Sequence, residues 1–470
     1  MRATKLVCTL GPATEHRVGE LVAAGMNVAR INCSHGARGE HDRLVRAVRD
    51  AAAEAGRAVG VMADLSGPKV RLGELENGHV TLEAGSRFVL RSDGAGQPGD
   101  ASGAATSYPG LAQELEPGDR VLLSDGEVEL RVVERTEAGL GTEVVRAGEV
   151  RSRAGVNVPS ERLGLPAISD KDQRDLAWAL EAGVDMVAQS FVRRALDVRA
   201  LRHLCGTLGP LLVAKIETRA AVEDAQQVID DADAVMVARG DLGVETALEE
   251  IPVIQKTLVS LANRAAKPVV IATQMLESMI RSPQPTRAET SDTAGAVFDG
   301  ADAILLSAET AIGDHPVEAA RTAARILDVA EVRGRAFLPR GREPDPLELE
   351  ELPLAKATAF LATREEAVAV VCFTSSGLTA RLISAARPGV PIFAFSPDVG
   401  ARGRLTLFHG VVSVTIEPPA DTDAMIESMD RGLREAGLAG PGERVIMVAS
   451  SPAGRTHANL LKVHQVGSGP

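Results

Sequence analysis

Short apolar runs that end in polar residues, separated by segments of helical periodicity, recur along most of this chain and constrain its fold more than any other feature. Each run has the length of a buried parallel strand, and amphipathic segments such as Asp170–Ala182 lie between the runs. Eight units of this kind are the number in a (β/α)8 barrel, so the sequence predicts an α/β fold built on a TIM barrel. The runs are Thr4–Thr9, Asn27–Asn32, Val59–Asp64, Val184–Ser190, Leu212–Glu217, Ala234–Arg239, Pro268–Thr273 and Ala303–Ser307.

The regular spacing is interrupted once, after the third run. Residues 69–153 carry short alternating runs punctuated by Gly and Asp, which predicts a small β-barrel inserted after the third strand. A charged, proline-rich linker at Pro339–Pro346 precedes four further strand-like runs, so a smaller α/β domain is expected beyond it. The expected domains are the barrel at 1–68 and 157–338, the inserted β domain at 69–156 and the C-terminal domain at 347–470.

Composition and charge limit which partners and which cellular location are expected for this chain. The net charge is −13, and no basic run interrupts the acidic composition, which argues against nucleic acid as a partner. No stretch approaches the roughly 18 apolar residues that a membrane helix requires. The first residues enter a strand-like run without an apolar signal region, so a cytoplasmic location is expected. The four cysteines are scattered, which favours free thiols over structural zinc.

Polar side chains follow the apolar runs at their C-terminal ends, where a (β/α)8 barrel forms its active site. Lysine and arginine at this position can neutralise charge on phosphoryl oxygens during transfer. Carboxylates from two neighbouring strands, Glu217 and Asp241, suit magnesium. The barrel mouth is therefore predicted to hold an anion and a divalent cation together. The polar set comprises Arg30, Asn32, Ser34, His35, Asp64, Lys215, Glu217, Arg239, Gly240, Asp241, Thr273, Ser307 and Glu309.

Several ordered motifs resemble those of the pyruvate kinase family. They span the predicted barrel and continue more weakly through the inserted and C-terminal domains. The resemblance implies an enzyme that transfers the phosphoryl group of phosphoenolpyruvate to ADP, giving pyruvate and ATP in the last step of glycolysis. It also implies Mg2+ or Mn2+ as cofactor, an allosteric homotetramer, and an inserted β domain that closes as a lid over nucleotide. The motifs include TKLVCTLGP (Thr4–Pro12), AGMNVARINCSHG (Ala24–Gly36), DLSGPKVRLG (Asp64–Gly73), AKIET (Ala214–Thr218), MVARGDLGVE (Met236–Glu245), ATQMLESM (Ala272–Met279) and LLSAETAIGDHP (Leu305–Pro316).

The resemblance also implies roles for single residues. Lys215, Arg30 and Thr273 are expected to be catalytic, with Lys215 stabilising the phosphoryl group and Thr273 near the site of enolate protonation. Glu217 and Asp241 are expected to bind the Mg2+. Substrate binding is expected from Arg30, Lys215, Ala238, Gly240, Asp241 and Thr273, and nucleotide binding from His35, Arg71 and Lys171.

Two further expectations concern a monovalent ion and an effector. Many relatives bind K+ through residues that match Asn32, Ser34, Asp64 and the main chain of Leu65, and carry glutamate where this chain has Lys69. A lysine ammonium supplies a positive charge there, so we expect activity without added potassium. The loop Thr374, Ser375, Ser376, Gly377, Leu378, Thr379 resembles an effector-phosphate loop, although the nearby segment Ser450–Val463 departs from the family pattern.

Other interpretations remain open from the sequence. A lysine at a strand end is often only a salt-bridge partner, and a histidine such as His35 can simply precede the next helix. A different barrel enzyme acting on phosphoenolpyruvate or pyruvate, such as an aldolase or lyase, would share the cations and metal ligands. It would lack the β insertion, Arg71 and the C-terminal domain. A catalytically silent relative that serves as a sensor or scaffold is the third possibility.

Overall fold

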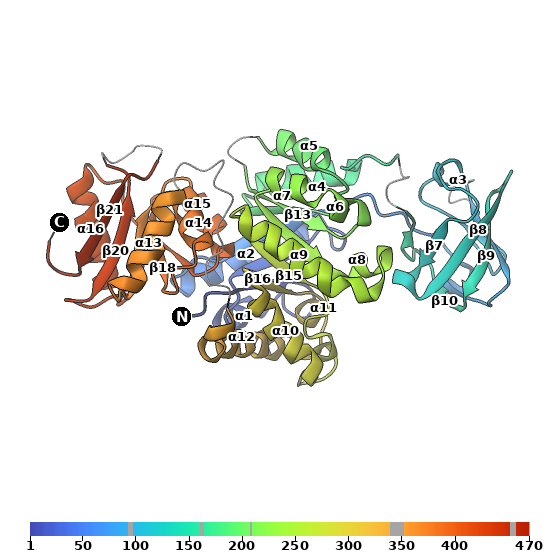
Figure 1. Ribbon diagram of the computed structural model, residues 1–470. Coiled ribbons are helices and arrows are strands. Elements are labelled where there is room, and N and C mark those ends of the chain that lie inside the picture. Colours follow the sequence, from blue (N-terminus) through green and yellow to red (C-terminus); the bar gives the residue numbers. More distant parts are fainter. Residues whose placement is uncertain (93–96, 160–163, 207–208, 339–351, 452–456, 470) are drawn as a thin grey trace.

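A closed barrel of eight parallel strands forms the centre of the protein (Figure 1). The computed structural model describes residues 1–92, 97–159, 164–206, 209–338, 352–451 and 457–469. Each of the eight predicted runs overlaps one barrel strand, and the fifth strand begins one residue before its run; this confirms the predicted fold class. The strands are β1 (Lys5–Thr9), β2 (Val28–Asn32), β3 (Gly60–Asp64), β12 (Met186–Gln189), β13 (Leu211–Ile216), β14 (Ala234–Ala238), β15 (Val269–Ala272) and β16 (Ala303–Leu306).

Helices surround the barrel and begin at recognisable sequence signals. Ser169 and Thr286 cap their helices, and each accepts a hydrogen bond from the main-chain N–H three residues later. None of the helices that the structure describes has the length and apolar content needed to cross a bilayer. The helices are α1 (Val18–Ala23), α2 (Arg38–Glu54), α4 (Asp170–Glu181), α5 (Ala195–Cys205), α6 (Arg219–Glu223), α7 (Ala225–Asp231), α8 (Arg239–Glu245), α9 (Ile251–Arg264), α10 (Arg287–Asp299), α11 (Ala308–Ala311) and α12 (Pro316–Arg333).

The inserted segment folds into two antiparallel-rich sheets with their own apolar core, at one end of the molecule (Figure 1). One sheet has the order β11-β7-β8-β9-β5-β6, and the other pairs β10 with β4. Alternating burial along β8 reflects the alternating sequence, because one face of that strand covers the core. The elements are β4 (His79–Leu82), β5 (Arg87–Arg91), β6 (Gly103–Ala105), α3 (Leu111–Glu114), β7 (Arg120–Leu123), β8 (Val128–Thr136), β9 (Gly139–Arg146), β10 (Gly148–Arg151) and β11 (Val156–Asn157).

Two chain segments that pair with each other join this inserted domain to the barrel. The Val156 N–H donates to the Val70 carbonyl at 2.9 Å, and the Leu72 N–H donates to the Ala154 carbonyl at 2.9 Å. Arg71 and Gly155 form an antiparallel bridge between these bonds. We call residues 68–72 and 154–158 the hinge ribbon.

The C-terminal domain lies at the opposite end of the barrel (Figure 1). Its sheet has the order β19-β18-β17-β20-β21 and contains the four predicted strands. The edge strand β21 is antiparallel and was not predicted. The expected linker Pro339–Pro346 and domain start at 347 lie outside the described residues. The elements are α13 (Leu352–Arg364), β17 (Ala369–Phe373), α14 (Leu378–Ala385), β18 (Ile392–Ser396), α15 (Val399–Arg404), β19 (Val411–Thr415), α16 (Thr422–Glu435), β20 (Arg444–Ala449) and β21 (Leu460–Gln465).

A side chain of the C-terminal domain completes the interior of the barrel. Leu407 is fully buried and packs in one apolar cluster with barrel-lining side chains that include Val28, Met62 and Met186. The approach is close, because a Cβ atom at Gly403 would lie 1.8 Å from the Asp185 carboxylate. The end of the barrel remote from the predicted active site is therefore filled from another domain.

Candidate active site

Lys215 occupies the centre of a buried polar cluster at the C-terminal ends of the barrel strands. Its ammonium Nζ donates to Ser190 Oγ at 2.7 Å and lies 3.2 Å from Glu217 Oε2 and 3.6 Å from Asp64 Oδ1. Burial alone would lower the pKa of Lys215, but the charges of Asp64 and Glu217 raise it above its ordinary value. The lysine is therefore a fixed positive charge at the barrel mouth.

Arg30 extends this positive surface from strand β2. Its Nε donates to Asp64 Oδ2 at 2.6 Å, and its Nη1 donates to Thr9 Oγ1 at 2.9 Å. Burial would raise the pKa of Asp64, but the charges of Lys215 and Arg30 hold it below its ordinary range. Asp64 thus stays ionised and fixes the positions of both cations.

Glu217 presents a buried oxygen that has no hydrogen-bond partner among the described residues. Its Oε1 accepts a 2.7 Å hydrogen bond from the Phe191 N–H, whereas Oε2 accepts no hydrogen bond from the described residues despite its ion pair with Lys215. Burial raises the pKa of Glu217 to about 7, opposed by Lys215 and reinforced by the Asp241 charge. A buried carboxylate with a free oxygen beside a second carboxylate is what a divalent cation would satisfy.

Asp241 is the second carboxylate, near the start of α8. Its Oδ1 lies 3.2 Å from the Lys69 ammonium, and both side chains are partly exposed. No group of three or more His, Cys, Asp or Glu side chains is arranged to hold a metal within the described parts of the chain. The donor set suits Mg2+, which commonly takes one or two carboxylates and completes its shell with water and substrate oxygens.

Thr273 follows β15 in an unusual backbone conformation. Thr273 has φ +68° and Gln274 has φ +56°, a region that costs free energy for residues other than glycine and is found at functional sites. The Gly240 N–H donates to Thr273 Oγ1 at 2.7 Å. Arg239 Nη2 donates to the Thr273 carbonyl at 2.7 Å, and Arg239 Nη1 forms an ion pair with Asp292 Oδ2 at 2.7 Å. Arg239 therefore supports the Thr273 turn.

The geometry agrees with comparisons to known proteins. The model of the pyruvate kinase barrel domain matches residues 1–320, and that of the pyruvate kinase alpha/beta domain matches residues 353–464. The chain belongs to the pyruvate kinase family. It is 41% identical over 477 residues to a pyruvate kinase of Corynebacterium glutamicum, covering 99% of this chain and 98% of that protein. It is also 41% identical to one of Mycobacterium tuberculosis H37Rv over 472 residues, with 99% of each chain covered.

Solved structures agree with the sequence comparisons. A crystal structure of a pyruvate kinase from Cryptosporidium parvum superposes with a TM-score of 0.90 at 32% identity, and covers 99% of this chain and 96% of that one. The chain is therefore an enzyme, and the predicted pyruvate kinase family is confirmed.

The residues expected to bind nucleotide in a pyruvate kinase lie on three different segments of the chain. His35 and Arg71 are exposed, and Arg71 belongs to the hinge ribbon, with Nη1 3.3 Å from the Arg153 carbonyl. The Lys171 ammonium donates to the Cys33 carbonyl and to Asp175 Oδ2, each at 2.5 Å. Lys171 thus adjoins the turn that carries His35.

The predicted K+ ligands lie at the ends of β2 and β3. The Ser34 N–H donates to Asn32 Oδ1 at 3.1 Å, and the Leu65 N–H donates to the Ala188 carbonyl at 3.0 Å. Both oxygens of Asp64 are engaged, Oδ2 by Arg30 and Oδ1 by Ser190. These contacts fix the positions of the Asn32 and Asp64 side chains at the ends of the two strands.

The predicted effector loop forms a tight turn between β17 and α14. The Gly377 N–H donates to Thr374 Oγ1 at 2.9 Å, and Gly377 adopts φ +96°. Ser375 and Ser376 are exposed, whereas Thr374 is buried and Thr379 is half-buried on the first turn of α14.

The sequence analysis overlooked Ser190 and Phe191, which follow β12. Ser190 Oγ accepts from Lys215 and donates to Asp64, and Phe191 positions Glu217 from a backbone with φ +55°. Ser190 ends the fourth predicted run, so the rule that located Asp64 and Glu217 also identifies Ser190. No sequence signal marks the conformation of Phe191.

Proposed function

We propose that the barrel mouth transfers the phosphoryl group of phosphoenolpyruvate to ADP and so forms pyruvate and ATP. The observation that carries this assignment is the buried Lys215 ammonium, held among Ser190, Asp64 and Glu217 beside Arg30. Phosphoryl transfer requires positioning and neutralisation of charge on the transferring oxygens. Lys215 and Arg30 supply that charge from positions that the surrounding hydrogen bonds fix before substrate binds.

Glu217 and Asp241 would hold a divalent cation, Mg2+ or Mn2+. The free Glu217 Oε2 supports this assignment, together with the Asp241 charge that raises the Glu217 pKa. When bound, such an ion neutralises substrate oxygens and orients them for transfer. Thr273 and the main chain of Ala238, Gly240 and Asp241 would bind the substrate carboxylate, and the Thr273 hydroxyl would pass a proton towards the enolate.

ADP would bind between the barrel rim and the lid, on His35, Arg71 and Lys171. Arg71 lies on the hinge ribbon, so movement of the lid would carry this cation towards or away from the nucleotide. A closed lid would exclude water that otherwise hydrolyses the phosphoryl group.

The potassium requirement would be relieved by Lys69. The position of its ammonium, 3.2 Å from Asp241 Oδ1, supports this, because Lys69 brings a positive charge to this side of the barrel mouth. We further propose a cytoplasmic homotetramer, in which Thr374–Thr379 binds an effector phosphate. The exposed apolar side chains of Leu248, just before α9, and Val253, on α9, support an assembly.

Pyruvate formation from phosphoenolpyruvate and ADP in the presence of Mg2+ tests the assignment. Turnover with these substrates supports it. A catalytically silent relative would give no pyruvate even at high enzyme concentration, and a lyase or aldolase would consume phosphoenolpyruvate without ADP-dependent formation of ATP. Either result would refute the proposal.

A further inference from the structure

Lys69 connects the lid hinge directly to one of the proposed metal ligands. It lies in the first segment of the hinge ribbon, and its Nζ is 3.2 Å from Asp241 Oδ1 on α8 of the barrel. The same ammonium lies 5.8 Å from the centre of the Phe191 ring, whose main chain positions Glu217. One flexible side chain from the hinge thus reaches the surroundings of both carboxylates.

The opposite segment of the hinge ribbon is shaped to let Lys69 lie in this position. A Cβ atom on Gly155 would come within 2.8 Å of Lys69 Cε, so the lysine stem crosses directly over a glycine. The Lys69 N–H donates to the Gly67 carbonyl at 3.0 Å, which begins the hinge in a tight turn after β3.

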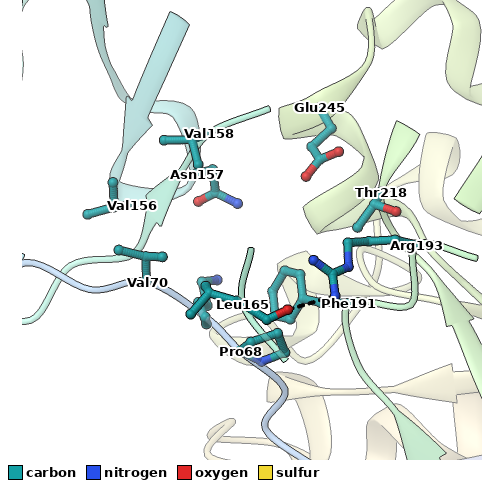
Figure 2. A pocket seen from close by; sticks show the side chains of 11 residues that line it. Pro68, Val70, Val156, Asn157, Val158, Leu165, Phe191, Arg193, Thr218 and Glu245 are labelled. Atoms are coloured by element: carbon teal, nitrogen blue, oxygen red, sulfur yellow. Dashed lines mark hydrogen bonds between the residues drawn. The ribbon is translucent and has the colours of Figure 1, made fainter. Parts of the chain in front are cut away.

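The hinge packs loosely against the barrel (Figure 2). A cavity of about 40 Å3 separates Val70, Val156 and Val158 of the ribbon from Phe191 and Thr218 of the barrel. Asn157 Oδ1 is buried at this cavity and has no hydrogen-bond partner among the described residues. A second cavity of about 210 Å3 also borders Asn157. A ribbon with voids behind it can shift without losing close-packed contacts.

We infer that Lys69 is a tether that the divalent cation displaces: it holds Asp241 in the metal-free enzyme, and metal binding releases it together with the hinge ribbon. This inference rests on the proposed metal site. A Mg2+ ion lies about 2.1 Å from a carboxylate oxygen. An ammonium that remained beside Asp241 would then sit within about 5 Å of the divalent charge, where like charges repel.

The tether has two consequences. Lys69 competes with the cation for Asp241, so the lysine lowers the affinity of the metal-free enzyme for divalent ions. Metal binding also frees the hinge ribbon before nucleotide arrives, so occupancy of the metal site changes the position of the lid. Lys69 acts here as a positioning residue.

Binding of Mn2+ to the substrate-free enzyme in a buffer without Na+ or K+ tests the competition. The free ion is measured by electron paramagnetic resonance, and correct folding of each variant is checked by its melting temperature. We expect Lys69→Met to bind Mn2+ about tenfold more tightly than the wild type, as one lost repulsive charge predicts. The matched control Lys256→Met removes an ammonium that pairs with Asp299 on the barrel surface, and should leave the affinity unchanged.

Hydrogen exchange of peptides that cover the hinge ribbon provides the second measurement. Mn2+ should increase exchange there in the wild type, whereas Lys69→Met should show the higher exchange already without Mn2+. The proposed role of Lys69 would be overturned if wild type and Lys69→Met bound Mn2+ with equal affinity. It would also be overturned if hydrogen exchange in the hinge ribbon of the wild type did not change on addition of Mn2+. Unchanged Mn2+ affinity in Glu217→Gln would instead overturn the proposed metal site on which this inference rests.

Discussion

The Ser190 hydroxyl lies 2.7 Å from the Lys215 ammonium, and Ser190 also donates to Asp64 at 3.2 Å. This serine, which is buried at the end of β12, therefore determines where the lysine charge lies relative to the transferring group.

Ser190→Ala should lower kcat by about tenfold, the effect expected when a hydrogen bond to a charged group is lost. The KM for phosphoenolpyruvate should change less, because Arg30 still supplies positive charge. Steady-state kinetics measure both constants. Ser86→Ala, on the exposed surface of the lid, is the matched control. A kcat equal to that of the wild type would contradict the positioning role of Ser190.

Lys215→Met should reduce kcat by at least about a thousandfold, because no other group occupies the position of the ammonium. The melting temperature should fall, because Asp64 and Glu217 lose the buried charge that pairs with them, but the methionine stem fills the same space and the variant should remain folded. A stopped assay for pyruvate is sensitive enough for the residual rate. Substantial turnover in a correctly folded variant would show that the barrel mouth works without Lys215.

The wild-type enzyme should turn over without potassium, and Lys69→Glu should make it potassium-dependent. The substitution replaces a positive side chain by a negative one and so restores the charge that a monovalent cation has to balance. The rates are compared in tetramethylammonium buffer with and without K+. A wild type that is inactive until K+ is added would refute the role of Lys69.

Lys5 should make the protein more stable as the pH rises from about 7 towards 10.5. Burial lowers the pKa of Lys5 to about 7, helped by Arg2 and Arg57, and its Nζ contacts the Val411 carbonyl at 2.6 Å. Between the two pKa values the unfolded chain binds the extra proton, so protonation favours unfolding. The slope is at most about 1.4 kcal/mol per pH unit. Denaturant unfolding at several pH values should show a flatter dependence for Lys5→Met.

Leu407→Ala should destabilise the barrel and the C-terminal domain together by about 2–5 kcal/mol, because it leaves a cavity in the barrel interior. Leu407→Met, which conserves volume, should cost less than about 1.5 kcal/mol. Calorimetry can follow both domains. A variant in which only the C-terminal transition moves would show that the contact does not stabilise the barrel.

The architecture was predictable because the apolar runs are long, buried and repeated, so each barrel strand was found within two residues of its place. Glu217, Asp241 and Lys215 were found for the same reason, since strand ends converge in a barrel. The edge strand β21 was missed because most of its residues are partly exposed, so its sequence lacks the continuous apolar run of a buried strand. The contact between Lys69 and Asp241 joins residues 172 positions apart across the hinge, and no local pattern encodes it.

Leu407 also bears on how the protein is made. All eight barrel strands leave the ribosome before this residue is synthesised. Until then, the end of the barrel that Leu407 fills exposes the apolar side chains of Val28, Met62 and Met186. Such an apolar opening is a place where a growing chain can aggregate or recruit a chaperone. The barrel interior is therefore fully covered only after the segment that carries Leu407 has been synthesised. Premature termination before Leu407 leaves this apolar end of the barrel exposed.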